Sequence, residues 1–170
     1  PALRSRNDCS SMDELIQEQC QPLYRFLLRL CGNDELANDL AQESLVCAWQ
    51  NRHQLRDSHN FRGWLFRIGL NVWRDHCRRP SRGEPLCEEP TSTELTPEQH
   101  VTMSEMGQAV WEAISKLPIR QKQVLHLRVI DQMEISEIAA TLDISSQLVR
   151  SNLSAARKKL RARFTNMNDG

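Results

Sequence analysis

A proline-rich stretch in the middle of the chain constrains the fold more than any other feature of the sequence. Between Arg79 and Pro97 the chain carries four prolines, separated mainly by Ser, Thr and Glu: Pro80, Pro85, Pro90 and Pro97. Such a segment cannot build a core, because proline fixes φ and lacks a backbone donor. We therefore expect a flexible, acidic, proline-rich linker at residues 80–103, between one domain at residues 12–79 and another at residues 104–165.

Both flanking parts show helical periodicity, and strand signals are scarce. The apolar spacing, with Gly32, Asn33 and Pro118 as breaks, predicts a series of helices. The predicted fold class is all-α, with two small helical domains joined by an extended linker, the second domain containing a helix-turn-helix. The expected helices cover about residues 13–30, 34–51, 61–79, from 102 onward, 119–130, 134–142 and 146–164.

Composition and hydropathy restrict the class of protein. The 170 residues are 39% hydrophobic and 26% charged, which is typical of a globular chain. No run of eighteen apolar residues occurs, so no insertion into a membrane is expected. The first residues, Pro1 to Arg6, lack the apolar centre of a signal peptide, which predicts a cytoplasmic location.

The net charge is zero, but the charges are segregated along the chain. Residues 12–47 carry seven acids and two bases, whereas residues 48–82 carry eight arginines and two aspartates. Residues 145–164 carry six bases and no acid. This segregation predicts that the basic segments bind a polyanion and that the acidic helix binds a different partner.

The pattern of the last two expected helices indicates a helix-turn-helix. Asp143 suits a left-handed turn, Ser145 suits an N-cap, and Ile144 can pack on Val149 as a hydrophobic staple. The outward face of the second helix then offers Gln and Arg for base edges in the major groove, with more bases beyond for phosphates. We expect the following DNA contacts there: Ser146, Gln147, Arg150, Ser151, Ser154, Arg157 and Lys158. A purely structural three-helix unit with a solvated basic tail is the alternative.

Two features of the first domain indicate other surfaces. The expected helix at 34–51 has an outward arc that mixes acids and amides with two apolar residues, at Glu35, Asn38, Asp39, Gln42, Glu43, Val46 and Trp49. An acidic and aromatic patch of this kind is typical of a protein interface, although a solvated face is the plainer interpretation. The helix at 61–79 interleaves aromatic residues with arginines, a composition that grips single-stranded nucleic acid, although Trp64, Phe66 and Trp73 can also be core residues.

No pattern for catalysis or a cofactor is present in the sequence. We find no catalytic carboxylate cluster, no phosphate-binding glycine loop and no metal-ligand spacing, so we predict no catalytic residue, metal or cofactor, and no enzymatic activity. The six cysteines form no Cys-x-x-Cys pair, and buried apolar positions explain most of them. A redox or zinc site formed by His76, Cys77 and Cys87 is the alternative.

Two motifs in order resemble the extracytoplasmic-function sigma factors of bacterial RNA polymerase. Asp39-Leu40-Ala41-Gln42-Glu43-Ser44 and Phe61-Arg62-Gly63-Trp64-Leu65-Phe66-Arg67-Ile68 are similar to the second conserved region of that family. Leu117-Pro118, Glu137-Ile138-Ala139 and Val149-Arg150-Ser151 are similar to its fourth region. The resemblance implies a transcription initiation factor whose partners are core RNA polymerase (through the β′ clamp and the β flap), promoter DNA and an anti-sigma factor.

The resemblance also assigns expected roles to individual residues. Contacts to the polymerase are expected from the acidic arc at Glu35, Asp39, Gln42, Glu43, Val46 and Trp49. Contacts to the −10 promoter element are expected from Arg56, Asp57, Ser58, His59, Asn60, Arg67, Asn71, Arg74 and Arg78. Contacts to the −35 element are expected from Arg128 and from the helix residues given above, Ser146 to Lys158. The sequence departs from the family at Leu55, where Phe is frequent, and at Ser154 and Ala155, where basic or aromatic residues are common.

Two other functions compete with this interpretation. A stand-alone helix-turn-helix regulator would share the C-terminal pattern, but it would need an α/β receiver or ligand-binding domain that the first half does not resemble. An enzyme acting on nucleic acid would need the catalytic patterns that the sequence lacks.

Overall fold

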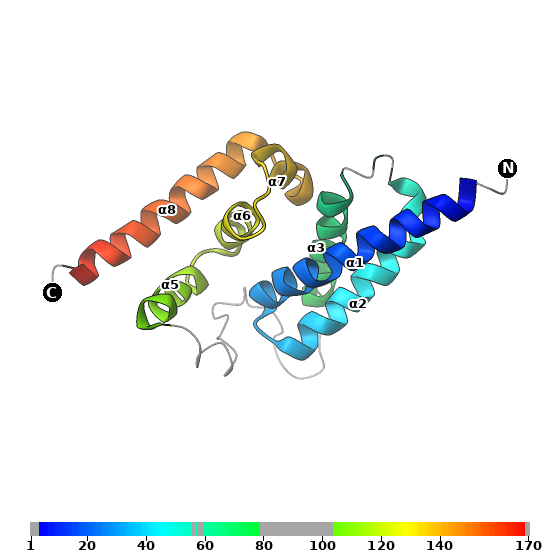
Figure 1. The fold of residues 1–170 in the computed structure, drawn as a ribbon. Coiled ribbons are helices and arrows are strands. Elements are labelled where there is room, and N and C mark those ends of the chain that lie inside the picture. The colour runs from blue at the N-terminus through cyan, green and yellow to red at the C-terminus, as the bar shows by residue number, and fades with distance from the viewer. Residues whose placement is uncertain (1–3, 56, 58–59, 79–103, 169–170) are drawn as a thin grey trace.

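The computed structural model describes residues 4–55, 57, 60–78 and 104–168, and every regular element in this part of the chain is helical. Among the described residues, the first half contains three α-helices and a short 3-10 helix, and the second half contains four α-helices (Figure 1). The all-α class and the two helical domains are therefore confirmed. In chain order the elements are α1 (Arg4–Cys31), α2 (Asp34–Gln50), η1 (Arg52–Gln54), α3 (Phe61–Arg78), α5 (Glu105–Ser115), α6 (Ile119–Val129), α7 (Ile135–Leu142) and α8 (Ser146–Asn168).

The first three α-helices pack on one another around a core of large side chains. The sharp turn between α1 and α2 follows from local chemistry: Gly32 has a positive φ of 68°, and the Asn33 side chain accepts a hydrogen bond of 2.8 Å from the Leu36 amide. Helix α3 approaches α1 closely at Gly69, where an added Cβ would lie 2.8 Å from a methyl carbon of Leu23. A larger residue at this helix crossing would therefore require the Leu23 side chain to shift.

Helix α1 is longer than expected. It begins at Arg4, nine residues before the predicted start at Asp13, and it continues through Pro22. The apolar periodicity on which the prediction depended begins only near Met12, which is buried. The polar turns before Met12 contain no glycine or proline that would end a helix, so the chain stays helical without an apolar stripe.

The second half forms the predicted helix-turn-helix. Asp143 has the left-handed conformation (φ 55°, ψ 52°), and the Ser145 hydroxyl accepts a hydrogen bond of 3.2 Å from the Leu148 amide. Both the turn residue and the N-cap are as predicted. Ser104 caps α5 in the same way, through the Gly107 amide, and Pro118 precedes the first turn of α6.

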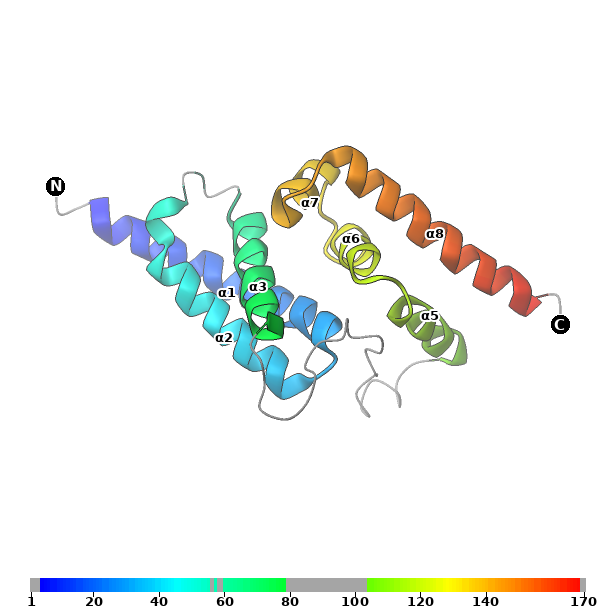
Figure 2. The same ribbon diagram turned by 180° about the vertical axis from the view of Figure 1, so that it is seen from behind.

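The two halves are in direct contact. Helix α7 packs against α3, and the two ribbon views place α7 beside the N-terminal half of α3 (Figures 1 and 2). The buried apolar residues of both halves form one contiguous cluster. The predicted linker at 80–103 lies outside the described residues.

Candidate nucleic-acid and protein interfaces

Helix α2 presents the predicted acidic arc to solvent. Its inward face is buried through small and apolar side chains such as Ala37, Leu40 and Ala48. The outward arc is exposed at each predicted position: Glu35, Asp39, Gln42, Glu43, Val46 and Trp49. Val46 is 57% exposed and Trp49 is 37% exposed, which is unusual for large apolar side chains and is typical of a protein-binding surface.

The aromatic end of this arc is held in place by Arg52. The Arg52 guanidinium lies 4.9 Å from the centre of the Trp49 ring and donates a 2.8 Å hydrogen bond to the Trp49 carbonyl. A cation above the ring face stabilises the indole orientation. The exposed tryptophan is therefore pre-ordered for contact with a partner.

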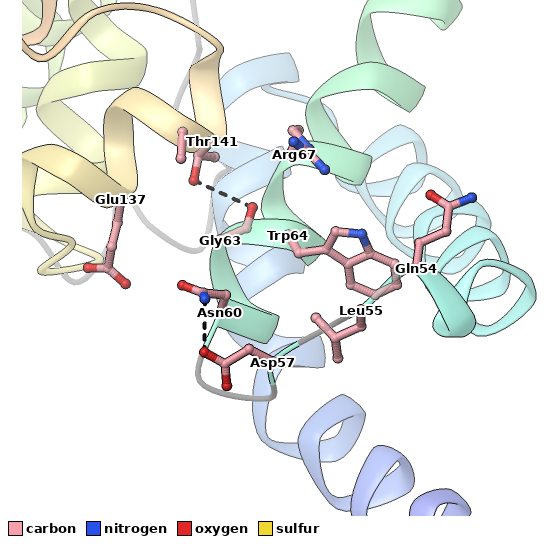
Figure 3. Close-up of a pocket in the computed structure, with 10 residues that line it drawn as sticks. Gln54, Leu55, Asp57, Asn60, Gly63, Trp64, Arg67, Glu137 and Thr141 are labelled. Atoms are coloured by element: carbon pink, nitrogen blue, oxygen red, sulfur yellow. Dashed lines mark hydrogen bonds between the residues drawn. The ribbon is translucent and has the colours of Figure 1, made fainter.

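A pocket of about 270 Å³ lies beside the loop between η1 and α3. From the first half it is lined by Gln54, Leu55, Asp57, Asn60, Gly63, Trp64 and Arg67 (Figure 3). The Asn60 side-chain amide donates a 3.1 Å hydrogen bond to the Asp57 carboxylate, and the backbone groups of the same two residues are also bonded. Half-buried Trp64 and Leu55 supply apolar walls, so the pocket combines stacking surface with polar groups, as a site for an unstacked base requires.

The outward face of α3 carries the other residues predicted to contact nucleic acid. Arg67, Asn71 and Arg78 are exposed, and Arg74 is half-buried. Burial lowers the pKa of Arg74, and the neighbouring Arg120 and Arg78 lower it further. The predicted residues Arg56, Ser58 and His59 lie outside the described part of the chain.

The aromatic residues of α3 divide between core and surface. Phe66 is fully buried and Trp73 is 7% exposed, so both belong to the core and neither can stack on a base. Trp64 alone of the three reaches the pocket. The regular alternation of aromatic and basic residues could not show this division, because it depends on which side of α3 contacts α1 and α2.

Helix α8 presents the predicted recognition surface. Gln147, Arg150, Ser151, Ser154, Arg157 and Lys158 are exposed, and Ser146 is half-buried. Leu148, which precedes buried Val149 on the same helix, is 46% exposed. An exposed leucine here can contact the methyl group of thymine, and sequence analysis missed it because an apolar residue beside buried Val149 suggests a core position.

A basic hollow of about 580 Å³ runs along this part of the second domain. Its lining combines five cationic side chains with Ser154 and two apolar residues: Arg128, Arg150, Arg157, Lys158, Arg161, Ile135 and Leu153. Arg128 is less available for a contact to DNA than predicted. It donates a 2.8 Å hydrogen bond to the Met133 carbonyl and pairs with Glu134 at 3.1 Å, so it also holds the turn before α7.

A buried ion cluster joins the two halves. Asp131, in the turn after α6, accepts hydrogen bonds of 2.9 and 3.1 Å from Nη2 of Arg29 in α1. Arg62 in α3 donates to the Asp131 carbonyl, and its guanidinium lies 3.9 Å from the carboxylate. Burial raises the pKa of Asp131 and lowers the pKa of Arg29. The charge of Arg29 partly offsets the rise at Asp131, and the charge of Asp131 partly offsets the fall at Arg29. Sequence analysis did not identify this cluster, because its members are far apart in the chain.

His126 of α6 is a second buried titratable group. Its side chain is 2% exposed, neither ring nitrogen has a hydrogen-bond partner, and its ring stacks on Trp111 with a centroid distance of 6.4 Å. Burial lowers the pKa of His126 to about 3, and the positive charges of Arg29 and Lys122 contribute. The imidazole is therefore neutral at physiological pH.

The metal alternative gains no support from the described residues. Within them, no three His, Cys, Asp or Glu side chains lie close enough together to hold a metal ion. Cys77 is half-buried in α3, and Cys87 lies outside the described part of the chain. Among the described helices, none has the length and apolar character needed to span a membrane.

Comparisons with known proteins agree with this arrangement. Residues 15–83 match the family model for sigma-70 region 2, and residues 107–160 match the model for sigma-70, region 4. The chain is 30% identical to the ECF RNA polymerase sigma factor SigL of Mycobacterium tuberculosis, over 91% of this chain and 89% of that protein. It is 32% identical to the ECF RNA polymerase sigma factor SigE of Mycolicibacterium smegmatis, over 89% of this chain but only 60% of that longer relative.

A solved structure shares the fold. The sigma factor RpoE of Bartonella quintana, crystallised in complex with the anti-sigma factor NepR, superposes with a TM-score of 0.75. The match covers 90% of this chain and 96% of that chain, with 22% sequence identity. The order and packing of the helices are therefore those of a known two-domain architecture.

Proposed function

We propose which residues carry out each role of this chain, which belongs to the extracytoplasmic-function (ECF) family of sigma-70 factors. The chain is an alternative sigma factor: it binds core RNA polymerase, and it directs promoter recognition and DNA melting at the start of transcription. The observation that carries this proposal is the presence of both sigma regions in one chain, each with an exposed surface suited to its role.

The exposed arc of α2 is the proposed anchor for the polymerase. It is acidic and amide-rich along its length and ends in the ordered Trp49. Such a surface combines electrostatic steering with an aromatic anchor, the two features that give a protein interface its rate of association and its binding energy. Its proposed target is the β′ clamp, while the second domain binds the β flap.

The pocket beside η1 is the proposed site for a base of the −10 element. Trp64 and Leu55 contact the face of an extruded base, and Asp57 and Asn60 can bond to its edge. Arg67, Arg74 and Arg78 on α3 then hold the backbone of the opened strand. Because the pocket has Leu55 where relatives often have Phe, stacking at this edge is weaker than with an aromatic residue.

Helix α8 is the proposed reader of the −35 element. Gln147 and Arg150 can each make bidentate contacts to base edges in the major groove, and exposed Leu148 adds an apolar contact. The cations that line the adjacent hollow contact phosphates and supply most of the salt-dependent affinity.

The chain carries out no catalysis of its own in this proposal, since the family consists of transcription initiation factors and the polymerase makes the RNA. An anti-sigma factor is the proposed regulator. The solved RpoE structure, which has the same fold, is a complex with such a partner. Family membership favours the sigma factor over a stand-alone helix-turn-helix regulator.

The test is the selection of promoter DNA by reconstituted polymerase. Core RNA polymerase with and without the chain is incubated with a pool of genomic DNA fragments, and heparin-resistant complexes are collected and sequenced. We expect the chain to enrich fragments that share two elements, one for each domain. Arg150→Ala should reduce this enrichment, whereas Lys159→Ala, which removes a cation from the opposite face of α8, should not. Enrichment of the same fragments without core polymerase would instead indicate a stand-alone regulator.

A further inference from the structure

We propose that Leu148 determines one base of the −35 element: it contacts the C5-methyl group of a thymine in the major groove. This inference rests on the function proposed above for α8, and it goes further by naming the base that one apolar residue selects. The −35 element is therefore expected to contain an A·T pair opposite the first turn of α8.

Leu148 lies in the part of α8 that enters the groove. Helix α8 begins at Ser146, so Leu148 belongs to its first turn, and the first turns of a recognition helix are those that reach base edges. Val149 is fully buried and turns its side of the helix into the core, whereas Leu148 is 46% exposed. Leu148 shares a side of α8 with exposed Ser151, three residues further on, so it lies beside a residue that is expected to contact DNA.

Two side-chain hydrogen bonds fix the backbone of Leu148. Its amide donates a 3.2 Å hydrogen bond to the hydroxyl of the N-cap Ser145. Its carbonyl accepts a 2.8 Å hydrogen bond from the side-chain amide of Asn152, which folds back onto the helix. The first turn is therefore ordered before DNA arrives, and an ordered contact loses little conformational entropy on binding.

The chemistry of the major groove leaves one favourable partner for an aliphatic side chain. Each base pair presents hydrogen-bond donors and acceptors there, and thymine alone adds an apolar group, the C5-methyl. A leucine placed against a donor or an acceptor removes that group from water without giving it a new bond, which costs free energy. A leucine placed against the methyl group removes apolar surface from water, which is favourable. Leu148 should therefore favour thymine over the other bases at its position.

The surroundings of Leu148 favour a base over a protein partner. Among the described residues of α8, Leu148 is the one large apolar side chain that is exposed. A protein interface would need a wider apolar patch, whereas a single methyl group needs only one apolar contact. The exposed neighbours Gln147 and Arg150 are long enough to reach base edges, and Ser151 is too short to cover Leu148. The first turn thus combines two polar contacts to bases with one apolar contact.

The test removes the methyl group and the leucine separately. The chain is bound to core RNA polymerase, and the genomic fragments that it selects define the upstream element. Each thymine of that element, on either strand, is then replaced singly by deoxyuridine, which lacks only the methyl group and keeps the same hydrogen-bonding groups. At one position we expect this replacement to weaken binding of the wild type by about three- to fivefold, the value of one buried methyl group. For Leu148→Ala the same replacement should have no effect.

Two control variants show whether the effect belongs to Leu148. Met106→Ala truncates an exposed apolar side chain of α5 and should keep the full difference between thymine and uracil. Gln147→Ala removes a neighbouring contact, so it should weaken binding to the element and still distinguish thymine from uracil at the same position. Alanine is a good helix former and Leu148 is not in the core, so we expect Leu148→Ala to fold, and circular dichroism verifies this.

The outcomes separate this inference from the function on which it rests. Selective binding by the wild type with no loss at any uracil would overturn the role of Leu148 and leave the −35 role of α8 intact. A loss that persists in Leu148→Ala would show that another group reads the methyl, and an upstream element without an A·T pair would exclude a thymine contact. Failure of the wild type to select any upstream element would instead contradict the proposed function of α8, and the inference with it.

Discussion

Acidification should destabilise the chain through His126, and the size of this effect follows from the pKa of that residue. The folded chain holds His126 at a pKa of about 3, against an ordinary value of 6.5 for the unfolded chain. Below pH 6.5 the unfolded state therefore binds a proton that the folded state does not, so the free energy of unfolding falls as the pH falls. Between pH 7.5 and pH 5.0 this single group should remove about 2 kcal/mol.

The charges around His126 add to the effect. Arg29 of the first domain and Lys122 of its own helix both disfavour the imidazolium, and neither ring nitrogen has an acceptor that could hold the added proton. The ring stacks on Trp111, so His126→Phe keeps an aromatic partner at this position while removing the titration. The other four histidines remain in both proteins and cancel in the comparison.

The assay is urea unfolding at pH 7.5 and pH 5.0, followed by circular dichroism, for the wild type and His126→Phe. Between pH 7.5 and pH 5.0, the free energy of unfolding of the wild type should fall by about 2 kcal/mol more than that of the variant. An NMR titration of the imidazole signals should show one histidine that stays neutral at pH 5.0 in the folded protein. Equal losses in both proteins, or a His126 signal that titrates near pH 6.5, would refute the reasoning.

Two further predictions concern packing and DNA binding. Gly69→Ala should destabilise the first domain by about 1–3 kcal/mol, because the added Cβ would lie 2.8 Å from Leu23. The control, Asp75→Ala on the exposed side of α3, should change the melting temperature little. Equal melting temperatures for the two variants would contradict the close crossing of α1 and α3. Arg157→Ala should weaken binding to duplex DNA and reduce the slope of log K against log salt by about one, as expected for one lost phosphate contact. An unchanged slope would place Arg157 outside the DNA interface.

Much of the fold follows from local patterns in the sequence. Asp143 and Ser145 were identifiable because the turn and the cap each depend on a few neighbouring residues, and the structure has both. The exposed arc of α2 was identifiable because a helix with one small, apolar face must leave its other face in solvent. These features needed no knowledge of distant contacts.

The features that sequence analysis missed depend on tertiary contacts. Asp131 is an isolated acid in the sequence, and its partners Arg29 and Arg62 come from another domain. His126 lies in an ordinary helical pattern, and only the packing of Trp111 and the proximity of Arg29 make it unusual. Phe66 and Trp73 belong to the core for the same reason, since the helix faces that meet α1 and α2 decide which aromatic residues are buried.

The most direct test of the central claim is binding to bacterial core RNA polymerase, measured by gel filtration. The wild-type chain is compared with an Asp39→Arg, Glu43→Arg variant and with a Glu14→Arg, Glu18→Arg variant, which makes the same charge change one helical turn apart on α1. We expect the wild type and the α1 variant to elute with the polymerase, and the α2 variant to elute alone. Failure of the wild type to co-elute would contradict the assignment as a sigma factor, and co-elution of the α2 variant would contradict the assignment of its anchor.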